Sequence, residues 1–250
     1  MKEQPEHSSN NLIDITMTAT RRPDILDQTL NSFVFGLFFP VLSQVRLIIN
    51  IDPAGLKVSS FDVLDVCQKY FLKGNICCRM AAEPNFGSAF CWTWSRVTAP
   101  WTFHLEDDWE LLHHVDILEM ISMMEAEPDL AVLRLPYKVT GPETSKNWNL
   151  FFPWNGRYFE CPSNYAGGAG FSGHPSLIRS EFVKKTLPLL NPQHNPEKQF
   201  HARIPEIQKI VQSYRYGVWA QPSSPPSVRD IGRPWMVQNG ILKECFIALF

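Results

Sequence analysis

Apolar residues follow two spacings that alternate through the first half of the chain. Continuous or alternating apolar runs predict strands at residues 12–18, 45–51, 75–80 and 101–105. Apolar residues three or four positions apart predict helices at residues 25–33, 61–70 and 88–97. This alternation predicts an α/β protein with a Rossmann-like fold, in which helices flank a mostly parallel central sheet.

The second half of the chain is built differently. Helices are predicted at residues 115–125, 180–187 and 204–213, and strands at residues 130–136 and 217–221. Residues 137–173 are predicted to be rich in loops and carry many aromatic side chains. The Pro- and Ser-rich run at residues 222–226 is predicted to be an active-site flap.

Length and composition favour one domain. The 250 residues, 44% of them hydrophobic, suffice to bury the core of one α/β domain. The polar residues 1–10 are expected to be a disordered lead, and residues 11–250 to form the domain. Within it we expect a nucleotide-sugar-binding half at residues 11–110 and an acceptor half at residues 130–236.

Three features favour a cytoplasmic protein without a transmembrane segment. The longest apolar run, residues 33–42, is interrupted by Gly36 and Pro40. The start of the chain lacks the apolar core of a signal peptide. The 6 cysteines form no CxxC pair or zinc-ligand spacing, which fits a reducing compartment. A net charge of -2 also argues against strong, sequence-independent binding to nucleic acid.

Three consecutive acidic residues, Glu106, Asp107 and Asp108, follow the predicted strand at residues 101–105. Their mutual repulsion is costly unless a cation neutralises them, and carboxylates favour Mg²⁺ or Mn²⁺. Because ligands bind beyond the carboxyl ends of parallel strands, Asp52, which follows another predicted strand, is expected on the same rim. The alternative is a solvated acidic turn that caps the next helix.

The order of these motifs resembles a GT-A glycosyltransferase of family 2. Residues 18–23 resemble the opening loop of that family, and Asp52 resembles its nucleotide-base carboxylate. Residues 85–88 resemble the segment that leads to its DxD motif. Here the acidic triplet stands for that motif, with Asp108 at the position that binds the metal on the diphosphate.

The resemblance covers residues 13–109 and extends more loosely to about residue 235. It implies a metal-dependent, inverting transfer of a sugar from a nucleotide diphosphate such as UDP to an acceptor hydroxyl, with Mn²⁺ or Mg²⁺ as cofactor. The implied donor-binding residues are Thr18, Thr20, Arg21, Arg22, Asp52, Asn85, Ser88, Asp107, Gly168, Arg229 and Arg233. The implied metal ligands are Asp108, Glu106 and Asp230.

In the second half the resemblance assigns a catalytic base. Glu197 stands where the family has a Glu-Asp motif, and a carboxylate there takes the proton from the acceptor hydroxyl. Lys198 replaces the second acidic residue of that motif. Asp230 stands where many relatives have His-x-Gly, and its carboxylate is suited to a hard cation. Residues 167–174 resemble the Gly-rich segment that floors the donor and acceptor pocket, with a plain turn as the alternative.

The sequence leaves the acceptor open between a glycan, a lipid-linked glycan, a protein side chain and a hydroxymethylated DNA base. The acceptor-binding candidates are His174, Trp154 and Tyr165. A modified base would have to be flipped out and stacked on aromatic rings, and the lack of basic charge argues against DNA. Two other functions are considered: a nucleotidyltransferase, whose Gly-rich phosphate loop is missing at residues 20–23, and a nucleotide-sugar-binding module without catalysis.

Overall fold

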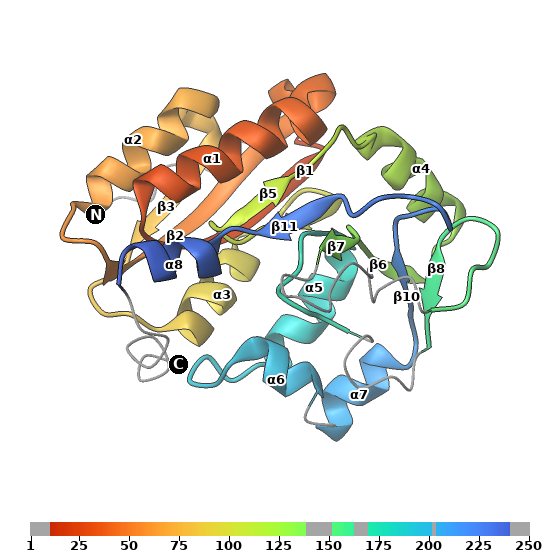
Figure 1. The fold of residues 1–250 in the computed structure, drawn as a ribbon. Helices are drawn as coiled ribbons and strands as arrows, with labels where there is room; N and C mark the ends of the chain where they lie inside the picture. Colours follow the sequence, from red (N-terminus) through yellow and green to blue (C-terminus); the bar gives the residue numbers. More distant parts are fainter. Residues whose placement is uncertain (1–10, 139–151, 163–169, 202–203, 241–250) are drawn as a thin grey trace.

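The central sheet is mostly parallel, as the sequence predicts. A computed structural model describes residues 11–138, 152–162, 170–201 and 204–240 (Figure 1). The strands of the central sheet are β1 (Ile13–Arg21), β2 (Val45–Gly55), β3 (Ile76–Met80), β4 (Trp101–His104), β6 (Leu130–Arg134), β8 (Phe159–Cys161), β9 (Ser176–Arg179) and β10 (Arg215–Val218). Their order is β3-β2-β1-β4-β9-β6-β10-β8, and β8 and β9 run antiparallel to their neighbours.

A small second sheet lies beside the first. It consists of β5 (Trp109–Leu111), β11 (Val228–Asp230) and β7 (Tyr137–Lys138), in the order β5-β11-β7. In the register of the antiparallel pair, Asp230 lies opposite Trp109 and Val228 opposite Leu111. This pair begins directly after the acidic triplet.

Helices cover both faces of the central sheet (Figure 1). The core on one face contains side chains of α1 (Pro23–Phe33), α2 (Ser60–Tyr70) and α4 (Ile117–Ala126). The core on the other face contains side chains of α3 (Phe86–Ser95), α5 (Ser180–Thr186), α6 (Pro196–His201) and α7 (Pro205–Val211). Two arrangements explain this layering: the strands are apolar on both sides, and each of these helices buries one apolar stripe.

Local capping fixes where helices begin near the rim. The side chain of Asn85 accepts a hydrogen bond from the backbone N–H of Ser88 at 2.8 Å, and so caps α3. Asp116 caps α4 by accepting from the backbone N–H groups of Leu118 and Glu119 at 2.9 and 3.1 Å. The last helix, α8 (Gly232–Gln238), follows β11 directly.

The structure extends the first two strands beyond their predicted ends. β1 continues to Arg21 and β2 to Gly55, with an irregular register between Ala19 and Arg21. Gly55 has a φ of 105°, which glycine adopts without strain. Asp52 therefore lies within a strand, not in the loop that the sequence predicted.

The helical path that begins as α1 continues past Gly36 and Pro40, the two residues that interrupt the apolar run in the sequence. The chain continues through a π-helical turn (Val34–Phe38) and a 3₁₀ turn (Phe39–Gln44). The whole run, Pro23–Gln44, is long and apolar enough to cross a membrane by length and composition, with a mean hydropathy of 1.4. Half of its most apolar 18-residue window is buried inside the domain, where Leu26, Leu30, Phe33 and Leu37 belong to the core.

Candidate active site

Asp107 is buried three residues after the end of β4, and it fastens the last residues of β1 and the short loop at Arg22 that follows them. Its Oδ2 accepts a hydrogen bond from the backbone N–H of Thr20 at 3.0 Å, and its Oδ1 accepts one from Nη2 of Arg22. The hydroxyl of Thr29 donates to the Asp107 carbonyl at 2.8 Å. The side chains of Arg22 and Asp107 are only 7% and 3% exposed. The carboxylate of Asp107 is thus engaged inside the protein, where it holds the loop in place.

Arg22 connects this loop to Asp108 and to the last helix. Its Nη2 lies 3.3 Å from Oδ2 of Asp108, and its guanidinium stacks 5.6 Å from the ring centre of Trp235 in α8. Burial lowers the pKa of Arg22, but the charges of Asp107 and Asp108 raise it by more, so Arg22 stays charged. Trp235 in turn donates from Nε1 to Asp24 at 2.7 Å. The loop after β1 and α8 therefore meet beside the acidic triplet.

Asp108 is half-buried, and its surroundings are short of positive charge. Burial raises its pKa to about 6; the guanidinium of Arg22 opposes this shift, and the charges of Asp107 and Asp230 add to it. A Cβ atom at Gly232 would lie 2.1 Å from Oδ2 of Asp108, which is far too close for any side chain. Glycine at this position is what gives the Asp108 carboxylate its room.

Asp230 ends β11 close to Asp108, as its effect on the pKa of Asp108 indicates. Its Oδ1 accepts hydrogen bonds from the backbone N–H groups of Gly232 and Arg233 at 2.8 and 3.2 Å, and its Oδ2 lies 3.2 Å from Nε of Arg233. The backbone N–H of Ile231 donates to the Asp108 carbonyl at 2.9 Å. Both oxygens of Asp230 thus have protein partners, and Asp230 supports the turn that positions Asp108.

Glu106 and Glu197 bring the two halves of the chain together. Burial raises the pKa of Glu106 well above its usual range, and the charges of Asp108, Glu197 and Asp107 add to this shift. Glu106 also lies against the Gly-rich segment, because a Cβ atom at Gly173 would be 3.0 Å from its Oε1. Glu197 is half-buried in the first turn of α6, near enough for its charge to raise the pKa of Glu106.

The short helix α6 is held firmly against its surroundings. The side chain of Gln199 accepts from the backbone N–H of Asn191 at 2.7 Å and donates to the carbonyls of Asn191 and His194 at 2.9 and 3.1 Å. Phe200 is 1% exposed and packs in the core. A Cβ atom at Gly87 would lie 2.5 Å from the carbonyl oxygen of His194, so the segment before α6 contacts α3 closely. These contacts fix the position of Glu197.

Asp52 lies at the centre of a hydrogen-bonded network on β2. Its Oδ1 accepts from the side-chain amide of Asn50 at 2.7 Å, and its Oδ2 accepts from the backbone N–H of Asn85 at 3.1 Å. Arg79 donates from Nε to the side-chain oxygen of Asn50. Burial raises the pKa of Asp52; these partners oppose the shift, and the charge of Asp107 adds to it. Asp52 and the acidic triplet therefore lie on one rim of the sheet, as the sequence predicts.

The other predicted arginines have partners of their own. Arg21 donates from Nε to the Ser60 hydroxyl at 3.3 Å, and Arg229 forms an ion pair with Glu110. The side chain of Arg233 is 69% exposed. Unlike Arg22, these three side chains do not contact the acidic triplet in the part of the chain that the structure describes.

His174 lies in an aromatic cluster next to the Gly-rich segment. Its ring centre is 4.3 Å from that of Tyr137 and 5.6 Å from that of Trp109. Burial, together with the charge of Arg134, lowers the pKa of His174 to about 3, so the imidazole is neutral. A neutral imidazole between two rings is able to hydrogen-bond a hydroxyl.

The remaining predicted residues lie elsewhere. Trp154 lines a separate hollow and does not join the acidic triplet. Thr18 is half-buried in β1, and Lys198, beside the predicted base, is exposed. Gly168 and Tyr165 lie outside the described residues.

The described residues fit an ion shared with a substrate better than a closed metal site. No three His, Cys, Asp or Glu side chains converge as a complete metal site in the described ranges. Mg²⁺ and Mn²⁺ commonly take one or two carboxylates and share their other positions with water and phosphate oxygens. Asp108 suits this role, since it is half-exposed and lies among carboxylates that a single guanidinium does not balance.

Three contributors to this rim were not predicted from the sequence: Asn50, Gly232 and Trp235. Asn50 lies two residues from Asp52 on β2, so both side chains point to the same face; the sequence analysis ended this strand at residue 51 and so missed the relation. Gly232 lies against Asp108, and Trp235 contacts Asp24 and Arg22; in each of these pairs the two residues are more than a hundred positions apart in the chain.

Comparisons with known proteins bear on the fold. No protein-family model matches the chain, and no curated protein matches it in sequence. Solved structures do match it. The mannosyltransferase PcManGT from Pyrobaculum calidifontis, in complex with GDP-Man and Mn²⁺, has a TM-score of 0.59 at 12% identity, over 91% of this chain and 60% of that one.

Structures of S. aureus TarS also match. TarS 1-349 in complex with UDP-GlcNAc has a TM-score of 0.57 at 11% identity, over 87% of this chain and 57% of that one. A longer TarS structure has a TM-score of 0.56 at 12% identity, over 89% of this chain and 37% of that one. The chain has the GT-A fold. It spans 37% to 60% of the length of these three glycosyltransferase structures.

Proposed function

We propose that this protein is a metal-dependent glycosyltransferase that moves a sugar from a nucleotide diphosphate to an acceptor hydroxyl with inversion. One observation carries the proposal: Asp52 on β2 and the acidic triplet after β4 lie on the same rim, near enough for Asp107 to raise the pKa of Asp52. In a GT-A fold, a base-binding carboxylate and a metal-binding carboxylate on that rim suit the two ends of a nucleotide diphosphate. Matching structures hold GDP-Man with Mn²⁺ and UDP-GlcNAc.

The donor is held by groups with distinct tasks. Asp52, oriented by Asn50 and Asn85, accepts a hydrogen bond from an N–H group of the base. Asp108 holds the cation, and Arg22 keeps Asp108 oriented without neutralising it fully. A bound Mn²⁺ or Mg²⁺ ion supplies positive charge to the diphosphate oxygens, which stabilises the leaving group.

Glu197 is the general base of the proposed transfer. Its carboxylate takes the proton from the acceptor hydroxyl while the hydroxyl oxygen forms a bond to the anomeric carbon. The bond from that carbon to the diphosphate breaks, and the diphosphate leaves with the electron pair. The half-buried position of Glu197, fixed by the contacts of α6, keeps the base beside the acidic triplet.

Two alternatives make different predictions. A nucleotidyltransferase would release pyrophosphate from a nucleoside triphosphate, and its phosphate loop would be rich in glycine, whereas Thr20 and Arg21 end β1 here and Arg22 follows them, without a glycine. A binding module without catalysis would bind a nucleotide sugar and release no nucleotide diphosphate from it, and replacing Glu197 would change nothing.

The test is a thermal-shift screen of nucleotide sugars with and without Mn²⁺, on the parent protein and on Asp108→Asn. A ligand that binds only the folded state at about 100 times its Kd raises the melting temperature by roughly 5–10 °C in a domain of this size. We expect such a shift for at least one nucleotide sugar, dependent on Mn²⁺ and absent in Asp108→Asn.

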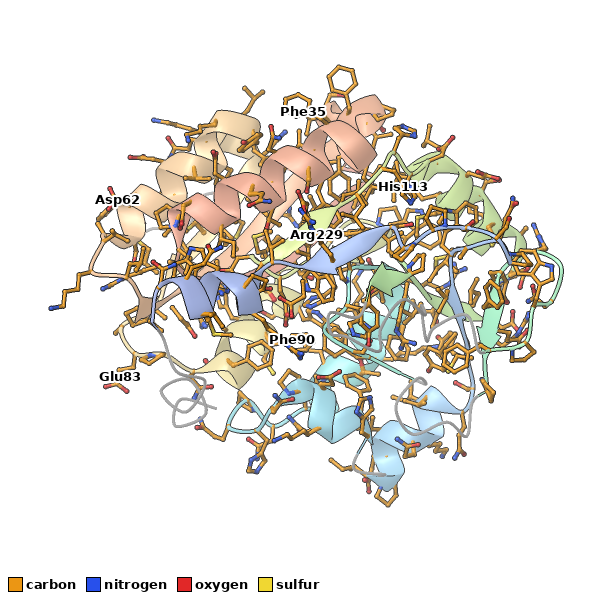
Figure 2. All side chains as sticks on the ribbon, viewed as in Figure 1. Phe35, Asp62, Glu83, Phe90, His113 and Arg229 are labelled. Carbon is orange, nitrogen blue, oxygen red and sulfur yellow. The ribbon has the colours of Figure 1, made fainter. Side chains whose placement is uncertain are left out.

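Glu83→Gln is the matched control, because Glu83 is an exposed carboxylate on the loop before α3 (Figure 2). It should keep the full shift. If Asp108→Asn showed the same metal-dependent shift as the parent, the assignment of the donor site would be wrong.

A further inference from the structure

A second hollow lies in the acceptor half, apart from the acidic triplet. Its volume is about 620 Å³, and residues from three segments line it, within 113–123, 154–157 and 219–227. Trp154 and Trp219 contribute aromatic surface, His113 follows β5, and Gln221 and Ser224 belong to the loop before β11. That loop includes the predicted flap at residues 222–226, which therefore borders this hollow.

The antiparallel pair of β5 and β11 connects the hollow to the acidic triplet. At one end of the pair, Asp108 precedes β5 and Asp230 ends β11; at the other end, His113 and Ser227 line the hollow. Ser227 accepts a hydrogen bond at its carbonyl from the backbone N–H of Leu112 at 2.8 Å, which extends the pairing to the edge of the hollow. Figure 2 labels Arg229 on β11 and His113 beyond the end of β5.

The length of β11 sets the distance between the edge of the hollow and the acidic triplet. Asp230 follows Ser227 by three positions, which corresponds to about 10 Å in a strand that rises about 3.4 Å per residue. A short chain of sugar units is long enough to cover this distance, and a single sugar is not.

The side chains of the hollow suit a neutral polyhydroxylated ligand. Trp154 is 36% exposed and offers a ring against which the apolar face of a sugar is able to pack. His113 and Gln221 are exposed, and they carry donors and acceptors for hydroxyl groups.

Charge around the hollow argues against a polyanion. Asp116 and Glu119 contribute two carboxylates, whereas the guanidinium of Arg157 is paired with Glu127 at 2.8 Å. A nucleic-acid backbone would meet no excess of positive charge here. The described residues also form no group of three metal-ligating side chains at this place.

We propose that this hollow is a saccharide-binding subsite, and that the acceptor of the proposed transfer is an oligosaccharide. One of its distal units stacks on Trp154, while the reacting hydroxyl lies beside Glu197 and the acidic triplet. The assignment of the ligand as an acceptor rests on the proposed function; the presence of a saccharide site does not.

The experiment screens neutral and acidic oligosaccharides on a glycan array without nucleotide, then measures the best ligand by calorimetry. Trp154→Ala should weaken its binding at least tenfold, and Gln221→Ala, a second variant at an exposed position, should weaken it severalfold. Phe39→Ala removes an exposed aromatic side chain outside the hollow and should leave the affinity unchanged. Melting temperatures of all variants verify that they are folded.

Three results would overturn the subsite. They are the absence of any oligosaccharide bound by the parent protein, an affinity in both Trp154→Ala and Gln221→Ala equal to that of the parent, and displacement of the oligosaccharide by a hydroxymethylcytosine oligonucleotide. The screen is independent of the nucleotide-sugar test. Binding of a nucleotide sugar without saccharide binding would overturn the subsite alone. Saccharide binding that Trp154→Ala abolishes, in a protein that binds no nucleotide sugar, would overturn the proposed transfer alone.

Discussion

The guanidinium of Arg22 bridges two successive carboxylates, donating to Asp107 in the interior and lying 3.3 Å from Asp108 at the rim. Its two partners serve different purposes. The bond to Asp107 joins the loop after β1 to the end of β4, and the contact with Asp108 orients a carboxylate that remains open to a ligand. One side chain therefore couples the stability of the fold to the geometry of the proposed metal ligand.

Arg22→Met should destabilise the protein by about 3–5 kcal/mol, because it leaves the buried carboxylate of Asp107 without its ionic partner. Urea unfolding measures this loss. The double variant Arg22→Met/Asp107→Leu should recover a large part of it, since no unpaired charge stays buried. Equal stability of the single and double variants would contradict this account of the pair.

Gly232→Ala should remove metal-dependent donor binding and leave the domain folded. The added Cβ would lie 2.1 Å from Oδ2 of Asp108 and so displace that carboxylate. Gly74→Ala is the matched control, as a Cβ there meets no heavy atom within 4 Å. Calorimetry with the nucleotide sugar and Mn²⁺ measures both variants, and unaltered affinity in Gly232→Ala would show that the Asp108 carboxylate is not the ligand.

Glu197→Gln should lower the rate of transfer by about 10²–10⁴-fold while donor affinity stays the same, since an amide is not a base. Glu206→Gln replaces an exposed glutamate in the first turn of the next helix and should have no effect. Release of nucleotide diphosphate in the presence of acceptor is the measurement. Full activity of Glu197→Gln would assign the base to another residue.

Affinity for the nucleoside alone should fall in acid. Burial raises the pKa of the Asp52 carboxyl above its usual range, and a base N–H group hydrogen-bonds more strongly to the ionised form than to the protonated one. The bound state therefore favours the carboxylate, so binding is full above the pKa of the free protein. As pH falls through that pKa, affinity should decrease by up to about tenfold per pH unit.

Nucleoside without phosphate keeps the cation out of this measurement, and NMR titration provides the affinities. Asp52→Asn should bind more weakly and show no such dependence on pH. The same acid dependence in Asp52→Asn would place the titrating group elsewhere.

The sequence predicted the long elements of the fold because their signals are local. The aliphatic run that became β2 and the spaced apolar residues of α2 each span several turns or strand positions. β9 has only four residues, Ser176–Arg179, directly before α5, and it was not predicted. Its place between β4 and β6 depends on pairing with two distant strands, which no local pattern records.

The same distinction applies to the rim. The acidic triplet and Asp52 were placed there from their positions at strand ends, which local patterns give. The bond between Arg22 and Asp107 and the contact of Gly232 with Asp108 join segments far apart in sequence. A single sequence contains the residue types of such pairs but not the geometry that joins them.

The position of β9 affects the order in which the sheet is able to form. β4 has β1 on one side, and its other neighbour is supplied by residues that follow it by about seventy positions. During synthesis, the edge of β4 stays unpaired until Arg179 has left the ribosome. β4 is therefore among the last strands in the first half of the chain to gain neighbours on both edges. In an N-terminal fragment that ends at residue 110, one edge of β4 would stay free to pair with strands of other chains.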